Sequence, residues 1–511
     1  MERGSKHYYF NNGDDIFMAC TTILVGKKAS YDGSTMIARN DDSGSGHFTA
    51  KKFVTIHPEE QSAAYKSVLS HVAIKLPLNP VRFTAVPNAV EGEGIWAASG
   101  VNEANVGMTA TETITSNPRV LGADPLVEYH PAQDGQPETA GGIGEEDIVY
   151  IVLPYIHSAR EGVERLGGLL EEYGTYEMNG IAFQDVNEIW WMETIGGHHW
   201  IARKVPDDVY VVMPNQLGLD RFDLEDALTE QKNYMCSADM KEFVEKNHLD
   251  LSLNGELNPR DAFGSHEDAD HIYNTPRAWF MLRYFNPHTK VWDGPNADFT
   301  PRSDDLPWCM VPEKKITPED VKYALSSHYQ GTPYDPYEGH GDPAMKGVFR
   351  PIGVNRNDFM ALIQMRPDVP EEFRVIEWIA FASNAFNALA PFYANVSETP
   401  DYLANTTKEI STDNFYWSSR MIAAMADASY SKSIFHIERY QLAVQSKGHA
   451  LINQYDEKLR REIDVAKRAA LREQANQKIA DMLKKETANT LDKVLFELSS
   501  QMKNAYSRSD A

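Results

Sequence analysis

Residues 20–42 have the sequence CTTILVGKKASYDGSTMIARNDD, in which two short β-forming runs flank a turn. The runs Thr21–Val25 and Thr35–Arg39 are rich in β-branched and apolar residues, and the Asp-Gly-Ser sequence between them is typical of a turn. Cys20 directly precedes the first run, and Asp42 closely follows the second. The stretch therefore predicts two strands with a thiol, a guanidinium and a carboxylate at their ends.

Similar strand candidates continue to about residue 220, and one helix interrupts them. They are Phe53–Ile56, Val72–Leu76, Val106–Thr111, Gly180–Phe183, Ile189–Glu193, His199–Arg203 and Val209–Met213. Between Glu145 and Tyr173, acidic residues at the start and apolar residues at helical spacing predict one long helix. Strands, a helix and strands again indicate an α+β fold with a mostly antiparallel sheet.

The rest of the chain divides into a loop-rich part and a helical part. Residues 221–345 are rich in loops and aromatic side chains, and apolar stretches from Ile352 to Asn395 would complete the sheet. Beyond Asn414 we expect helices, including one over residues 455–505. One face of that helix would carry Ile463, Ala466, Ala470, Ile479, Met482 and Leu483. We expect this face to pack either on its own domain or against another copy of the chain. The second arrangement predicts a homo-oligomer.

We expect three segments: a leader at 1–19, a main domain at 20–400 and a helical region at 401–511. With 74 acidic and 49 basic residues, the net charge of −25 argues against a nucleic-acid partner. The charge fits either a solvated acidic surface or capture of a basic ligand. No run reaches the roughly 18 apolar residues of a membrane span, and the leader lacks a signal-peptide core. A cytoplasmic protein without a membrane partner is expected.

The cysteines favour one functional thiol over a disulfide framework or a zinc site. Three of them, Cys20, Cys236 and Cys309, are scattered along the chain. Cys20 is either a buried structural residue or a nucleophile whose pKa is lowered by the nearby cation of Arg39. Asp42 would then lie near an α-amine with a pKa near 8, suited to proton transfer at neutral pH. A surface salt bridge is the alternative for Arg39 and Asp42.

The stretch from Cys20 to Asp42 resembles the bacterial cysteine-type dipeptidases. The likeness continues in Ala98–Thr113, Trp190–Trp200, Met213-Pro214-Asn215-Gln216, Tyr273–Arg277 and Gly331–Asp335. The resemblance implies an N-terminal-nucleophile hydrolase with a four-layer αββα fold that cleaves dipeptides of broad composition without a metal or cofactor. The chain also lacks His-Glu-x-x-His, and His198 and His199, adjacent on a predicted strand, would face opposite sides.

Bile-salt hydrolases and penicillin acylases are more distant members of the same superfamily, and their catalytic pattern implies roles for five residues. These residues are Cys20, Arg39, Asp42, Asn215 and Arg277. Asn215 would stabilise the oxyanion, or it is a turn residue after Pro214. Arg277 would orient the catalytic cluster or the substrate, or it forms a structural ion pair.

One position departs from the pattern of the amidase relatives. Where those enzymes carry an asparagine after a Gly-Met-x-x strand, this chain has Glu112 beside Thr111. An ionised carboxylate has no proton to donate to an oxyanion. We hypothesise that Glu112 contacts the free ammonium group of a dipeptide; the alternative is a carboxylate paired with a neighbouring cation.

Nineteen residues precede Cys20, although the implied mechanism requires it to be residue one of the mature protein. The leader is either a propeptide removed when the Cys20 thiol attacks the Ala19 carbonyl, a start-site artefact, or a permanent extension. We predict a dipeptidase. The alternatives are an acyl-amide hydrolase of the bile-salt or penicillin type and a non-catalytic structural homologue.

Overall fold

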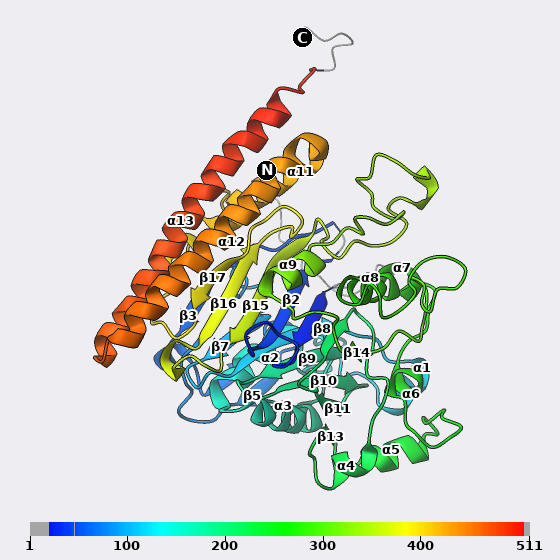
Figure 1. The fold of residues 1–511 in the computed structure, drawn as a ribbon. Coiled ribbons are helices and arrows are strands. Elements are labelled where there is room, and N and C mark those ends of the chain that lie inside the picture. The colour runs from blue at the N-terminus through cyan, green and yellow to red at the C-terminus, as the bar shows by residue number, and fades with distance from the viewer. Residues whose placement is uncertain (1–19, 45, 505–511) are drawn as a thin grey trace.

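Two antiparallel β-sheets form the centre of this computed structural model, which describes residues 20–44 and 46–504 (Figure 1). The seven-stranded sheet has the order β14 (Cys309–Met310), β12 (Tyr210–Met213), β1 (Thr21–Val25), β2 (Thr35–Asp42), β15 (Asn357–Met365), β16 (Val375–Phe381) and β17 (Ala390–Tyr393). The eight-stranded sheet has the order β13 (Tyr234–Cys236), β11 (His199–Lys204), β10 (Ile189–Ile195), β9 (Asn179–Gln184), β8 (Gly107–Thr113), β7 (Ser99–Asn102), β6 (Phe83–Ala85) and β3 (Val54–Ile56). A hairpin pairs β4 (Ala64–Lys66) with β5 (Ala73–Lys75).

Helices pack against both sheets. α2 (Glu145–Val152) and α3 (Ala159–Tyr173) pack on the eight-stranded sheet, whereas α12 (Tyr430–Arg461) and α13 (Val465–Ser499) pair along β17 of the other (Figure 1). The remaining α-helices are α1 (Pro118–Ala123), α4 (Leu224–Leu228), α5 (Met240–Lys246), α6 (Pro259–Phe263), α7 (Asp270–Tyr273), α8 (Thr275–Phe285), α9 (Pro318–Leu325), α10 (Asp401–Ala404) and α11 (Phe415–Ala428). Among the described residues, none of these helices combines the length and apolar composition needed to cross a bilayer.

Alternation of side chains along the strands creates separate apolar layers. Trp190 and Met192 of β10 pack in a cluster with α2 and α3. The intervening Trp191 joins Leu24 of β1 and Ile37 of β2 in a second cluster between the sheets. Because successive residues of a strand point to opposite faces, one strand serves both layers. The inner face of β2 thus lies in the interior of the molecule.

The predicted α+β class with antiparallel sheets is confirmed, but the single helix expected from Glu145 to Tyr173 is wrong. α2 ends at Val152, a 3₁₀ turn covers Leu153–Tyr155, and α3 begins at Ala159. Pro154 in that turn has no N–H group to continue the helix. Ser158 then caps α3 by accepting a hydrogen bond from the Glu161 amide at 3.1 Å.

The helix expected over residues 455–505 is also interrupted. α12 ends at Arg461, and Asp464 caps α13 by accepting a hydrogen bond from the Lys467 amide at 3.0 Å. Ile463 lies in the intervening turn and is 90% exposed. Only the later part of the predicted apolar face is buried, with Ile479 and Leu483 in the core that includes β17. The turn changes the direction of the chain. A helical periodicity extended across it therefore predicts the wrong set of buried residues.

A buried hydrogen bond connects the two sheets. Thr84 of β6 donates to Oε2 of Glu377 of β16 at 2.7 Å, and both residues are about 1% exposed. Burial raises the pKa of Glu377 to about 8, although the bond from Thr84 acts in the opposite direction. The folded chain therefore holds this proton to a higher pH than the unfolded chain, whose glutamates titrate near 4.3.

We predict that Glu377→Gln raises the melting temperature relative to the wild type at pH 8 and that this advantage shrinks towards pH 5. The wild-type carboxyl contributes its full stability below the unfolded pKa and loses it progressively as the pH rises from about 4.3 to about 8. Glutamine has no such proton to lose, and its carbonyl oxygen still accepts from Thr84. Thermal unfolding at pH 5, 6.5 and 8 measures the difference. An equal difference at all three pH values would contradict the assignment.

Candidate active site

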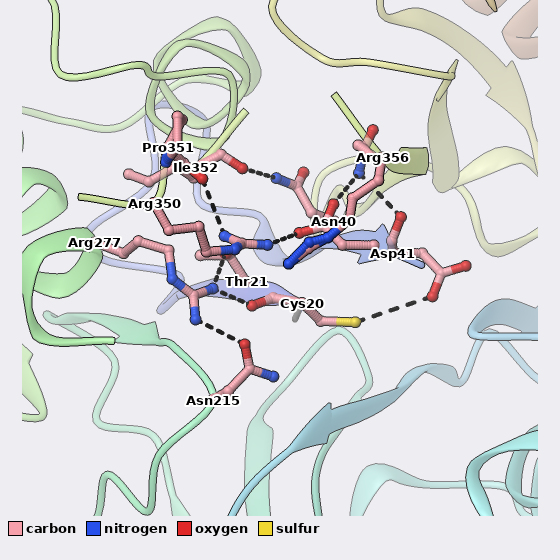
Figure 2. A network of polar contacts seen from close by, with 12 residues as sticks. Cys20, Thr21, Asn40, Asp41, Asn215, Arg277, Arg350, Pro351, Ile352 and Arg356 are labelled. Atoms are coloured by element: carbon pink, nitrogen blue, oxygen red, sulfur yellow. Dashed lines mark hydrogen bonds and ion pairs between the residues drawn. The ribbon is translucent and has the colours of Figure 1, made fainter. Parts of the chain in front are cut away.

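Cys20 lies immediately before β1 and is fully buried. The antiparallel register pairs Thr21 with Asn40 and Thr22 with Arg39, which brings the cysteine to the end of β2. Its Sγ accepts a hydrogen bond from Nη2 of Arg39 at 2.7 Å. The sulfur also lies 4.0 Å from Oδ1 of Asp41, a contact drawn in Figure 2. The predicted thiol and guanidinium are therefore in direct contact.

Arg39 connects the thiol to two buried carboxylates. Its Nη2 lies 3.1 Å from Oδ1 of Asp41 and 2.6 Å from Oε1 of Glu145, the first residue of α2. Burial disfavours the charged guanidinium, but the neighbouring Cys20, Glu145 and Asp41 outweigh it and raise the pKa of Arg39 well above its ordinary value. A permanent positive charge is thus fixed beside the sulfur, which favours the thiolate.

A second arginine, Arg277 of α8, fixes the backbone of Cys20. Its Nη1 donates to the Cys20 carbonyl oxygen and, at 2.6 Å, to Oγ1 of Thr21 (Figure 2). Its Nη2 donates to Oδ1 of Asn215 at 2.7 Å, and Nδ2 of Asn215 donates to the Thr113 carbonyl at 2.9 Å. Two predicted residues distant in sequence are thereby joined to the cysteine.

Asp42 lies on the opposite face of β2 from Arg39. The strand was expected to end at Arg39, but it continues to Asp42, and residues three apart in a strand point to opposite sides. The carboxylate of Asp42 pairs with Arg350 and accepts a hydrogen bond from Nδ2 of Asn357 at 2.8 Å. The carboxylate on the face of Arg39 is instead Asp41. The role of Asp42 beside the cysteine amine stays a prediction.

Sequence reasoning missed two residues of this cluster, Asp41 and Glu145. Strand alternation was the available signal for Asp41, because it stands two residues from Arg39. Glu145 was assigned only to a helix start, and nothing in its local sequence connects it to β2. Contact over 106 positions of chain is visible only in the folded structure.

The side chains of Thr111 and Glu112 lie outside the part of the chain that the structure describes, as do residues 1–19. The backbone of Glu112 belongs to β8 and pairs with Gly180, next to an irregularity in register after Ala110. The proposed contact of Glu112 with a substrate ammonium group, the role of Thr111 and removal of the leader stay predictions.

The Cys20, Asp41 and Glu145 ligand atoms lie within 4.8 Å of one another, a spacing that a metal ion would accept. Nη2 of Arg39 is within hydrogen-bond distance of all three. The guanidinium therefore already supplies the cation that these groups require. The expectation that no metal takes part stays a prediction.

The two adjacent histidines were expected to face opposite sides of a strand, but the structure brings both side chains to the same carboxylate. His198 lies in the turn before β11, and both His198 and His199 contact Asp124 through Nδ1, at 2.9 and 2.6 Å. Burial opposes the charged form of Asp124, but the hydrogen bonds from both histidines lower its pKa to about 2. The His198–Asp124–His199 contacts link the β10–β11 turn to the end of α1.

The two other thiols have environments unlike that of Cys20. Burial raises the pKa of Cys236 to about 12 and that of Cys309 to about 11. Neither receives a hydrogen bond from an arginine in the described structure comparable to the contact at Cys20. Of the three cysteines, Cys20 has the environment that favours a nucleophilic thiolate.

Comparison with known proteins gives the family. Residues 19–443 match the model of Peptidase family C69. The chain is 54% identical to "Dipeptidase" of Bifidobacterium longum (strain NCC 2705), with 96% of this chain and all of that protein covered. It is 52% identical to "Probable dipeptidase A" of Streptococcus pyogenes serotype M3 (strain SSI-1), over 96% of this chain and all of that protein. "Probable dipeptidase B" of Lactococcus lactis subsp. lactis (strain IL1403) is 44% identical, and the match covers 96% of this chain and 98% of that protein.

The chain therefore belongs to Peptidase family C69, and the resemblance to the cysteine-type dipeptidases is confirmed. It is a peptidase, an enzyme that acts on peptide bonds. The match begins one residue before Cys20 and covers both arginines of the site.

We predict that Arg39→Gln lowers the rate of Cys20 alkylation by iodoacetamide at pH 7 by about tenfold or more. The variant removes the cation at 2.7 Å and leaves two carboxylates facing the sulfur, so the thiolate becomes less stable. Mass spectrometry of the Cys20 peptide measures the rate. Arg366→Gln, which breaks the remote Arg366–Asp456 ion pair, is the control. Equal rates in wild type and Arg39→Gln would contradict thiolate activation by Arg39.

Proposed function

We propose that this chain is a dipeptidase of broad specificity whose nucleophile is Cys20, made N-terminal by removal of residues 1–19. The observation that carries the proposal is the buried contact of 2.7 Å between the Arg39 guanidinium and the Cys20 sulfur. The names of the relatives support the substrate class, because the two matched over their full length are named "Dipeptidase" and "Probable dipeptidase A". The two alignments cover 96% of this chain.

In the proposed reaction the Cys20 thiolate attacks the carbonyl carbon of the peptide bond, and the carbonyl oxygen becomes an oxyanion. Arg277 orients Asn215 through its Oδ1, so that the amide nitrogen is the donor this side chain offers to the oxyanion. The C–N bond then breaks, and the Cys20 α-amine gives its proton to the leaving amino group. Water, deprotonated by the same amine, hydrolyses the thioester and restores the Cys20 thiolate beside the protonated amine.

The two sheets with helices against them support the four-layer αββα architecture of N-terminal-nucleophile hydrolases as part of this proposal. The proposed enzyme acts on small peptides in the cytoplasm without a metal, cofactor, nucleic acid or membrane. Exposed apolar side chains on α12 and α13, among them Phe435, Leu442 and Phe496, support self-association through the helical region.

We predict that the purified enzyme hydrolyses dipeptides at least about 100-fold faster than acyl-amides of the bile-salt or penicillin type. Cys20→Ala should lose activity by about 10³-fold or more, because no other thiol in the site replaces the nucleophile. Cys236→Ala, which removes a buried thiol distant in sequence, should retain activity. Rates of amide hydrolysis on both substrate classes give the result.

The same assay separates the alternatives. Faster hydrolysis of acyl-amides would indicate an acylase, and a folded protein inactive on both classes would indicate a non-catalytic homologue. A fully active Cys20→Ala would place the chemistry elsewhere in the molecule.

A further inference from the structure

The ion pair between Arg39 and Glu145 leaves one polar atom of each side chain without a partner. Nη2 of Arg39 bonds Oε1 of Glu145 at 2.6 Å, but Nη1 of Arg39 and Oε2 of Glu145 have no hydrogen-bond partner among the described residues. Both side chains are completely buried. Buried polar atoms are nearly always hydrogen-bonded in folded proteins, and a buried charge is costly unless it is fully paired. An unpaired donor beside an unpaired acceptor therefore indicates a place for a ligand.

The Glu145 carboxylate that carries this acceptor is close to the nucleophile. The ligand atoms of Cys20 and Glu145 lie within 4.8 Å of each other. The other carboxylate beside the thiol, Asp41, is already saturated, because Oδ1 contacts Arg39 at 3.1 Å and Oδ2 contacts Lys51 at 2.9 Å. Glu145 is thus the residue of this cluster that still has a buried anionic oxygen to offer.

An aminoacyl group with a free amino terminus matches this arrangement. Before attack, a nucleophile and its carbonyl carbon lie about 3–3.5 Å apart. The ammonium nitrogen of the same residue is only two covalent bonds of about 1.5 Å from that carbon. A carbonyl placed on the Cys20 sulfur therefore brings the ammonium group to the neighbourhood of Glu145. The carbonyl oxygen of that residue is an acceptor of the kind that Nη1 of Arg39 requires.

We propose that Glu145 binds the free α-ammonium group of the peptide whose carbonyl Cys20 attacks, and thereby selects substrates with an unblocked amino terminus. The inference rests on the proposed function, because it assumes peptide hydrolysis by Cys20. It assigns to Glu145 the role that sequence reasoning gave to Glu112. The ammonium–carboxylate contact also aligns the scissile carbonyl, since both groups belong to one residue of the substrate.

The next residue of α2 provides a matched control. Glu146 is as buried as Glu145, but its oxygens accept hydrogen bonds from Ser67 at 2.7 Å and from Tyr176 at 2.5 Å. Its carboxylate is therefore occupied by the protein itself. Glu146→Gln makes the same chemical change one position away and should leave the preference for a free amino terminus intact.

The test compares alanyl-alanine with its deamino analogue, propionyl-alanine, which keeps the scissile amide and lacks the ammonium group. For the wild type and the Glu146→Gln variant, kcat/KM should strongly favour alanyl-alanine. In Glu145→Gln the ratio of kcat/KM for alanyl-alanine to kcat/KM for propionyl-alanine should fall on the order of 100-fold. The fall should come from a lower kcat/KM for alanyl-alanine, as expected when one partner of a buried charged pair is removed. Glu145 also pairs with Arg39, so the rate on propionyl-alanine should fall as well, but by much less than the rate on alanyl-alanine.

Equal losses of Glu145→Gln on both compounds would mean that Glu145 acts only by positioning Arg39, and would overturn the proposal. A retained ratio would also overturn it, as would loss of the preference in Glu112→Gln but not in Glu145→Gln. If Glu145→Gln does not fold by circular dichroism, Glu145→Asp is used, whose shorter carboxylate should lower the ratio about tenfold; an unchanged ratio contradicts the assignment. A wild type that cleaves neither compound refutes the proposed function itself.

Discussion

The contact between the Arg39 guanidinium and the Cys20 sulfur is the interaction on which the rest of the site depends. A completely buried guanidinium is costly unless anionic groups surround it. Here those groups come from β2 as Asp41, from α2 as Glu145 and from the residue before β1 as the thiol. Under the proposed function, a Cys20 thiolate would be one of the charges that stabilise the buried cation, and the fold that buries Arg39 would also activate Cys20.

Two different arginines contact the backbone and the sulfur of Cys20. Arg277 contacts the carbonyl oxygen of Cys20 and the Thr21 hydroxyl, whereas Arg39 contacts the sulfur. Neither contact uses an atom that precedes Cys20 in the chain. In the proposed enzyme, removal of residues 1–19 would therefore leave both arginines with their partners, and the free amine would form on a cysteine that is already positioned.

Local sequence patterns predicted the strands and contacts that depend on residues close together in the chain. The bounds of β1 and the proximity of Cys20 and Arg39 follow from residues 20–42, because two strands joined by a short turn bring their ends together. The approach of Asn215 and Arg277 to Cys20 came from family resemblance, since no local rule brings together residues that are 195 and 257 positions from Cys20. The expected strand ended three residues before the end of β2, and for that reason Asp41, on the same face as Arg39, was not predicted. Glu145 could not be placed because its partner lies on a distant strand.

Covalent labelling tests the central claim most directly. A thiol-reactive dipeptide chloromethyl ketone, added at one equivalent to the active enzyme, should inactivate it, and peptide mapping should find the label on Cys20. The labelled peptide should begin at Cys20, because the account requires this residue to be the amino terminus of the active protein. A label on Cys236 or Cys309, or on a peptide in which Ala19 still precedes Cys20 in fully active enzyme, would contradict the account.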